Sequence, residues 1–470
     1  MRQLDFAKGR ITGIILQAAL PMLVAQFLNL LYNIVDRIYI ARIPEIGTTA
    51  LGGVGLCFPV IVILTAFANL FGSGGAPLFA IARGKGDRKE AEDVMNTSFF
   101  LLVTGGILLT VFGLLIARPL LFAFGASKDS IVYALPYLRI YLVGTVFSMT
   151  ATGLNPFLNA QGYVQAGMLT VMIGAVVNIV LDPVFIFVFH FGVSGAALAT
   201  ILSQTLSAWF VVRSLHSKRE MRLRLFSFRE ARAHVSTMRE ITGLGLAAFT
   251  MQLTNSLVSI CCNNVLSRTG GDLYVSVMTI VSSVRQMVET PMYALTDGSS
   301  PVISFNYGAR RPERVKQALL CMFVLCMGYG LIMWLFILHA PGLLLSLFTS
   351  DPDLTKDAIP AMELYFAAFV FMVFQYTGQT MLKSLNKKKL AIFFSLLRKA
   401  FIVVPLTFLL PYAFGMGTDG VFLAEPVSNV IGGSACFITM LATILPELNR
   451  MAKENAARKE ETSYENPSRI

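Results

Sequence analysis

Four oxygen-bearing side chains occur in stretches of sequence that are otherwise apolar. The segment VVNIVLDPVFIF, residues 176–187, carries Asn178 and, one helical turn later, Asp182. Two other apolar segments carry Asp36 and Thr200. Hard oxygen ligands of these kinds suit Na⁺, and two close carboxylates can instead share a proton. Taken singly, each residue could equally serve as a helix–helix hydrogen bond or reach interfacial water, so the interpretation depends on the four lying together.

The composition indicates that these segments lie inside a membrane. The chain of 470 residues is 55% hydrophobic and only 14% charged, with a mean hydropathy of +0.67. A soluble domain carries about 25% charged residues. Apolar runs of the length needed to cross a ~30 Å hydrocarbon core recur along the whole chain. The sequence therefore predicts an all-α polytopic membrane protein, in which an intramembrane aspartate needs a partner or a function.

The apolar runs predict twelve transmembrane helices. Several of them exceed 25 residues, which implies that they tilt, bend or protrude beyond the bilayer. The expected spans are 12–40, 49–81, 92–117, 129–154, 163–190, 193–214, 238–267, 272–305, 315–339, 356–382, 390–414 and 418–445.

The net charge of +11 is distributed in a way that indicates the orientation of the chain in the membrane rather than nucleic-acid binding. Lys and Arg gather at both termini and in every second connection, which places both termini in the cytoplasm of a multi-pass protein of the cell (inner or plasma) membrane. No small-residue cleavage site follows the N-terminal decapeptide, so the first span is expected to remain as an anchor. The basic connections are 83–89, 213–239, 310–316 and 383–389.

The two halves of the chain resemble one another. GAPLFAIARGKGDRKEAEDV (75–94) aligns with SSPVISFNYGARRPERVKQA (299–318) at an offset of 224 residues. Further segments align in the same order, which predicts two pseudo-symmetric six-helix lobes that rock around a central cavity. The expected domains are an N-lobe (1–217), a cytoplasmic basic linker (218–236), a C-lobe (237–446) and a polar, disordered cytoplasmic tail (447–470).

The predicted spans place the four polar residues at similar depth. Asp182 lies about 19 residues, or roughly 28 Å, into the fifth span from its cytoplasmic end. Asp36 lies about 24 residues into the first span, also from the cytoplasmic side, and Thr200 lies only a few residues into the sixth span, which starts outside. Asn178 and Asp182 share one helix face because they are four residues apart. All four are therefore expected in the outer half of the N-lobe.

The sequence lacks the motifs of several other function classes. The six cysteines form no C-x-x-C pair, the four histidines form no H-E-x-x-H motif, and the glycine-rich GSGGAPLFAIARGKGD lacks the phosphate-loop pattern. We therefore expect no enzyme and no cofactor. Active transport would be driven by an ion gradient, with H⁺ or Na⁺ as the coupling ion. A passive channel is less compatible with the two-lobe repeat.

The chain resembles the multidrug and toxic compound extrusion (MATE) transporters over nearly its full length. The resemblance is carried by NIVDRIYIARI, GSGGAPLFAIARGKGD, NAQGYVQAGMLTVMIGAVVNIVLDPVFIF and GVSGAALATILSQ, with ETPMYALTDGSSPVISFNYGARRPERVKQA typical of the MepA-type and DinF-type branches. It implies a secondary antiporter that exports organic, cationic and amphipathic compounds by alternating access. It also implies that Asp36, Asn178, Asp182 and Thr200 form the cation or proton site, with no other metal site.

The second lobe departs from one branch of the family. The seventh span has no carboxylate, so the C-lobe ion site of the NorM-type branch is not transferred. Arg285 and Glu289, at i and i+4, could neutralise one another. Arg285, Glu289 and Glu425 could each be a structural or a substrate contact, and Glu425 is the repeat counterpart of Thr200.

The partners expected are a small-molecule substrate and the lipid bilayer, with the chain as a monomer and no nucleic acid. The alternative function is a lipid-linked or metabolite flippase or exporter of the same superfamily.

Overall fold

The helical architecture predicted from the sequence is confirmed. The computed structural model describes residues 3–44, 46–217, 221–348 and 352–465, and regular structure within these ranges is entirely helical. Because backbone polar groups have no water partners in hydrocarbon, a chain with repeated apolar runs satisfies them within helices.

The contacts divide the chain into two compact units. The N-unit consists mainly of Leu20–Phe79 and Asp87–Leu253, and also includes the N-terminal residues up to Leu4. The C-unit consists of Asp5–Ala19, Ala80–Gly86 and the chain from Thr254 onward. The lobe boundaries inferred from the repeat stay a prediction.

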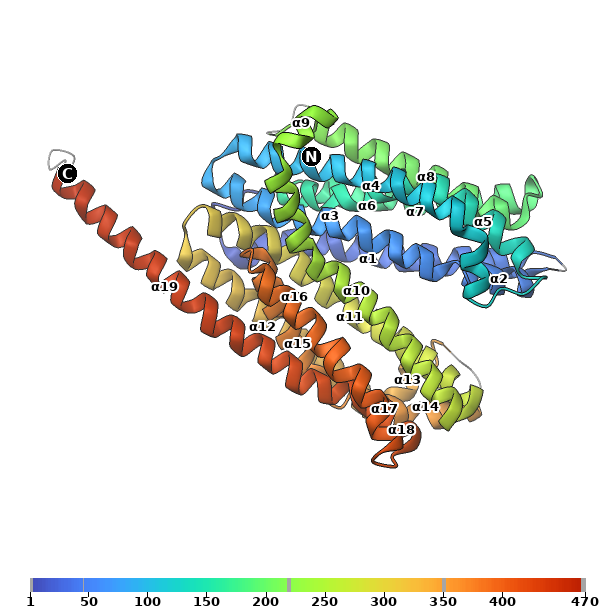
Figure 1. Ribbon diagram of the computed structural model, residues 1–470. Coiled ribbons are helices and arrows are strands. Elements are labelled where there is room, and N and C mark those ends of the chain that lie inside the picture. Colours follow the sequence, from blue (N-terminus) through green and yellow to red (C-terminus); the bar gives the residue numbers. More distant parts are fainter. Residues whose placement is uncertain (1–2, 45, 218–220, 349–351, 466–470) are drawn as a thin grey trace. The chain divides into compact units, whose positions relative to one another are not determined.

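The first half of the chain forms nine α-helices and one π-helix within the described residues (Figure 1). They are α1 (Ile11–Ala41), α2 (Gly47–Gly55), α3 (Phe58–Lys85), α4 (Arg88–Ala123), α5 (Ile131–Val143), α6 (Thr145–Ala160), α7 (Val164–Pro183), η1 (Val184–Val188), α8 (Gly192–His216) and α9 (Phe228–Ala233).

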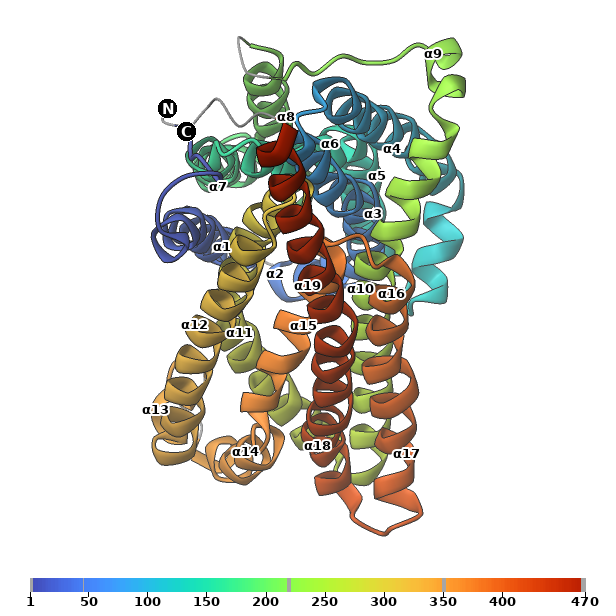
Figure 2. The ribbon, with the colours of Figure 1, turned by 90° about the vertical axis from the view of Figure 1, so that its left-hand side faces the viewer.

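The second half of the chain is again built of long helices with short interruptions. In the C-unit, α12, α15 and α19 pack together (Figure 2). The elements are α10 (Val235–Thr269), α11 (Gly271–Gly308), α12 (Pro312–His339), α13 (Pro341–Leu345), α14 (Pro352–Tyr365), η2 (Phe369–Phe371), α15 (Met372–Ser384), α16 (Lys388–Leu396), η3 (Leu397–Val403), α17 (Val404–Tyr412), α18 (Gly417–Ser428), η4 (Asn429–Gly433) and α19 (Ser434–Glu465).

Every predicted span coincides with helix, but the spans are not equally apolar. Among the described residues, nine helices are long and apolar enough to cross a membrane. Two further spans are bent pairs, α5 with α6 at 56° and the α14 region with α15 at 47°. The remaining predicted span is α11, whose composition is more polar because it carries Arg285, Glu289 and Asp297.

The polar tail is more ordered than the sequence predicts. The polar composition predicts disorder for 447–470, yet α19 continues to Glu465, and 466–470 lie outside the described residues. Ala, Glu, Lys and Arg in this segment favour helix. Tyr307 donates a hydrogen bond to Glu447 at 2.5 Å, and Lys387 pairs with Glu447 at 2.6 Å, so the start of the tail is also held by side-chain contacts.

The described part of the basic linker, residues 221–236, is also held against the N-unit. Residues 218–220 lie outside the described residues. The backbone N–H of Arg224 donates to Oδ1 of Asn96 on α4 at 2.7 Å. Ser227 and Glu230 form a capping box at the start of α9. The Ser227 bonds to the Glu230 carboxylate lower the pKa of that exposed group.

Candidate functional site

Helix α7 brings two polar side chains into the interior of the N-unit. Asn178 and Asp182 are 1% and 0% exposed, and Nδ2 of Asn178 donates to Oδ1 of Asp182 at 3.2 Å. They meet because residues four apart are neighbours on one helix face. The predicted pairing of these two residues is therefore present in the structure.

A change of helical geometry follows Asp182 directly. Pro183 cannot donate a backbone hydrogen bond, and the chain continues as the π-helix η1. The wider turn is seen in the hydrogen bond from the Phe189 N–H to the Val184 carbonyl at 2.9 Å. Such π-helical turns inside α-helices are frequent at functional sites.

Helix α8 packs against α7 and brings Thr200 to the same place. The Thr200 hydroxyl donates to the Ala196 carbonyl at 2.9 Å and accepts a long hydrogen bond from Nδ2 of Asn178 at 3.4 Å. Gly195 allows α8 to lie close to η1, since a Cβ at this position would lie 2.8 Å from the backbone carbonyl of Phe185.

Asp36 reaches the same group from α1. It is half-buried, and its carboxylate lies close enough to interact with Asp182. Its neighbour Arg37 lies over the ring of Phe58, 4.4 Å from the centroid. The structure thus gathers all four residues predicted from the sequence, and their role in binding a cation or proton stays a prediction.

Three oxygen atoms of this group are buried without a hydrogen-bond partner among the described residues. They are Oδ1 of Asp36, Oδ1 of Asn178 and Oδ2 of Asp182. Buried acceptors nearly always accept a hydrogen bond in folded proteins, because leaving a buried acceptor without one costs roughly 1–3 kcal/mol. Unsatisfied oxygens on three side chains are the arrangement expected of a site that holds a cation, or a proton shared between carboxylates.

Sequence reasoning missed the tyrosines of this site. Tyr32 and Tyr137 both interact electrostatically with Asp36 and Asp182, and Tyr137 stacks on Tyr141 with centroids 6.4 Å apart. Tyr32 lies four residues before Asp36, a spacing that could have identified it. The α5 tyrosines gave no such signal.

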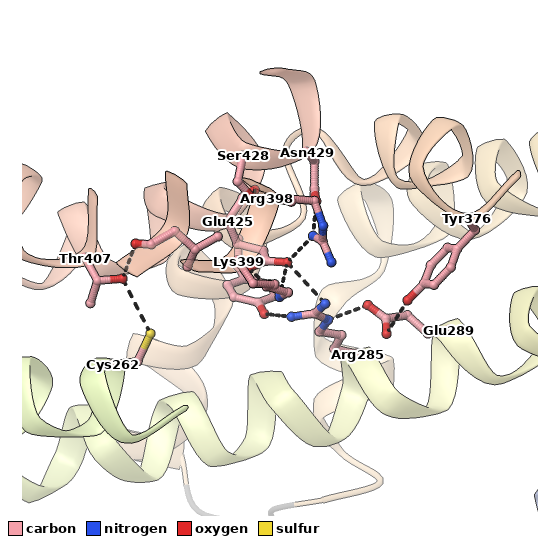
Figure 3. Close-up of polar contacts among 12 residues, drawn as sticks. Cys262, Arg285, Glu289, Tyr376, Arg398, Lys399, Thr407, Glu425, Ser428 and Asn429 are labelled. Carbon is pink, nitrogen blue, oxygen red and sulfur yellow. Dashed lines mark hydrogen bonds and ion pairs between the residues drawn. The ribbon is translucent and has the colours of Figure 1, made fainter. Parts of the chain in front are cut away.

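A second polar group, which we call the C-unit ion cluster, consists of Arg285, Glu289, Arg398, Lys399 and Glu425 (Figure 3). Its side chains come from α11, η3 and α18. The i,i+4 ion pair of Arg285 and Glu289 predicted from the sequence is present. Arg285 also pairs with Glu425 at 3.1 Å.

Comparison with known proteins decides the family. The MatE family model matches residues 21–184 and again 247–409. The chain belongs to the MatE family. The double match also agrees with the two-fold repeat read from the sequence.

Curated relatives of this MatE protein are similar along most of their length. They include "Multidrug export protein MepA" of Staphylococcus haemolyticus (strain JCSC1435), 24% identical and covering 96% of this chain and 97% of the relative. The "FAD transporter" of Shewanella oneidensis is also 24% identical, over 90% of this chain and 93% of the relative. The expected resemblance to MATE transporters of the MepA-type branch is confirmed.

Solved structures confirm the fold of this MatE chain. "Outward-facing conformation of a multidrug resistance MATE family transporter of the MOP superfamily" aligns with a TM-score of 0.87 at 24% identity, over 96% of this chain and 99% of that one. A MOP superfamily transporter from Pyrococcus furiosus Vc1 aligns with the same values. Together with the family match and the curated relatives, the apolar helices make the protein a multi-pass membrane transporter.

Proposed function

We propose that the protein is a secondary antiporter that exports small organic compounds in exchange for H⁺ or Na⁺ by alternating access. The observation that carries the proposal is the set of unpaired buried oxygens on Asp36, Asn178 and Asp182. A cation bound at this group would find unsatisfied oxygen ligands there, and a proton shared by Asp36 and Asp182 would remove one of two adjacent negative charges. The coupling ion is the only cofactor that the function needs.

The geometry around Asp182 supports coupling between ion binding and movement. Pro183 and the π-helix η1 interrupt the regular hydrogen-bond ladder of α7 next to the site. A change of charge at Asp182 would act at this weak point, which allows the end of the helix to shift. Coupling requires that ion and cargo have different affinities for the two states. We therefore propose that ion binding lowers the affinity for cargo.

The cargo that fits best is an amphipathic organic cation. The relatives named multidrug export proteins support this class, as does an acidic pair beside the aromatic rings of Tyr32 and Tyr137, which suits cations. The FAD transporter among the relatives favours a second candidate, a metabolite exporter. We place the protein in the plasma membrane with both termini in the cytoplasm, as the basic connections indicate. We also propose that it acts as a monomer.

Transport by the purified full chain in proteoliposomes tests this function. Export of a fluorescent organic cation should follow an imposed pH or Na⁺ gradient, and Asp36→Asn should abolish it while the protein still inserts normally. The matched control is Asp129→Asn, which changes an exposed aspartate outside the site. Normal gradient-driven export by Asp36→Asn would remove this residue from the mechanism, and export without any gradient would contradict antiport.

A further inference from the structure

The C-unit ion cluster carries a formal excess of one positive charge when each basic and acidic side chain is counted in its ordinary charged form. Arg285, Arg398 and Lys399 contribute three cationic groups, whereas Glu289 and Glu425 contribute two carboxylates. Four of these five side chains are no more than 6% exposed, and Arg285 is 16% exposed. A buried charge without compensation is costly, so a cluster of this composition favours an added negative charge.

The oxygens of the two carboxylates are already engaged by nearby donors, so they do not offset the excess positive charge further. Oε1 of Glu425 lies 2.8 Å from both Nη1 of Arg398 and Nζ of Lys399, and Lys399 also reaches Oε2 at 3.0 Å. On Glu289, Arg285 occupies one oxygen and the Tyr376 hydroxyl donates to the other at 2.9 Å. Every carboxylate oxygen in the cluster already accepts a hydrogen bond.

Arg398, in contrast, has guanidinium N–H donors that the cluster does not use. Its Nη1 serves both Glu425 and Oδ1 of Asn429, the latter at 2.7 Å. Its other terminal nitrogen makes no hydrogen bond or ion pair with the residues drawn in Figure 3. Gly432 permits this placement, since a Cβ there would lie 3.0 Å from Cγ of Arg398. The remaining edge of the guanidinium therefore carries N–H donors that none of the residues drawn in Figure 3 accepts.

The backbone at the cluster is unusual as well. Arg398 and Lys399 lie in the π-helix η3, and Asn429 begins the π-helix η4. Two interruptions of regular helix therefore flank one buried charged group, and such interruptions are often retained for function rather than for stability. The rings of Tyr293 and Tyr376 lie edge to face beside Glu289, with centroids 4.8 Å apart.

We propose that the C-unit ion cluster is an anion subsite that binds a carboxylate or phosphate group of the cargo. The proposal rests on the proposed transport function and narrows the proposed organic cations to those that also carry an acidic group, that is, to zwitterions. Arg398 binds the anion through its unused edge, because a guanidinium fork matches carboxylate and phosphate geometry.

Binding in detergent tests the subsite without any gradient. The probes are dansylglycine, which carries a carboxylate, and dansylamide, which has the same fluorophore and no charge. The full-length chain should bind dansylglycine at least about tenfold more tightly than dansylamide, since charge-assisted hydrogen bonds add to the affinity. Arg398→Gln should remove this difference, and Arg398→Lys should retain part of it.

Two further variants separate an anion site from a merely structural cluster. Glu289→Gln raises the excess charge to two and should tighten dansylglycine binding, a gain that damage to the fold would not produce. Arg268→Gln, an exposed cation on α10, is the control and should change nothing. Binding that ignores probe charge, an absence of saturable dansylglycine binding, or an equal response of both probes to Arg398→Gln would overturn the proposal.

One additional arm identifies the source of the anion. Phosphatidylglycerol added to the micelles, but not phosphatidylcholine, should displace dansylglycine if an acidic lipid headgroup can occupy the subsite. Retention of the probe would assign the subsite to soluble cargo, and either result supports an anion site. Ion coupling is measured separately, as gradient-driven export in proteoliposomes, so failure of this proposal and failure of ion coupling are separately visible.

Discussion

Asn178 donates to Asp182 across one turn of α7, and the same amide nitrogen lies 3.4 Å from the Thr200 hydroxyl on α8. This arrangement commits the amide nitrogen to two oxygens and leaves the carbonyl oxygen of Asn178 without a partner among the described residues. The amide therefore orients one oxygen of Asp182 and supplies another oxygen to the site.

Asp182→Asn should uncouple cargo from ion. A neutral amide cannot change charge, so cargo affinity in this variant should no longer fall when H⁺ or Na⁺ binds. The measurement is the affinity for a fluorescent organic cation in detergent over a series of pH values and Na⁺ concentrations. Wild-type sensitivity to pH alone would identify a proton antiporter. Equal sensitivity in wild type and Asp182→Asn would rule out this role.

Thr200→Val should weaken the ion site, whereas Thr200→Ser should nearly preserve it. Valine keeps the shape of threonine but removes the oxygen that accepts from Asn178. The loss of one such hydrogen bond, about 1 kcal/mol, corresponds to roughly five- to tenfold in the ion concentration that gives half-maximal transport. Identical ion dependence in the valine and serine variants would show that the hydroxyl takes no part.

Glu425→Gln should destabilise the protein strongly. Arg285, Arg398 and Lys399 all lie against this one buried carboxylate, and removing it leaves their charges uncompensated. Breaking a buried pair in this way costs about 3–5 kcal/mol. Thermal unfolding in detergent should show a large fall in Tm. The control is Glu313→Gln at an exposed pair with Lys316, expected to cost about 1 kcal/mol or less.

Gly195→Ala should disturb the site through packing alone. The added Cβ would lie 2.8 Å from the carbonyl of Phe185, a backbone group that cannot simply rotate away. We expect a loss of about 1–3 kcal/mol in stability and a weaker ion site, because α8 carries Thr200. Gly328→Ala, where a Cβ would meet nothing within 4 Å, is the control. Unchanged ion dependence in Gly195→Ala would contradict the argument.

The capping box before α9 should loosen in acid. Hydrogen bonds from Ser227 hold the pKa of Glu230 below its ordinary value of 4.5. A folded-state pKa below the unfolded one contributes stability at higher pH, and this contribution is lost as the pH falls from about 4.5 through the folded-state pKa. The protection factors of the α9 amides, which correct hydrogen exchange for its intrinsic slowing in acid, should therefore fall below this pH in wild type, and Glu230→Gln should remove this fall. Unchanged protection factors in wild type would contradict the prediction.

The sequence by itself determined the helical spans and the core of the N-unit site. Apolar runs of membrane-crossing length must be helical, because lipid offers no partners for backbone groups. The spacing of four residues between Asn178 and Asp182 then fixes their shared face without knowledge of any neighbouring helix. Asp36 and Thr200 were recognisable as the polar residues at similar depth in other spans.

Only the tertiary structure decided which helices face one another. Tyr137 comes from α5 and Asp36 from α1, and nothing in either segment shows that they interact. The convergence of Arg398 and Lys399 on Glu425 likewise depends on how η3 and α18 are rotated. Helical periodicity specifies a face, whereas the partner of that face depends on the angle and register of packed helices, which are set by contacts distant in the sequence.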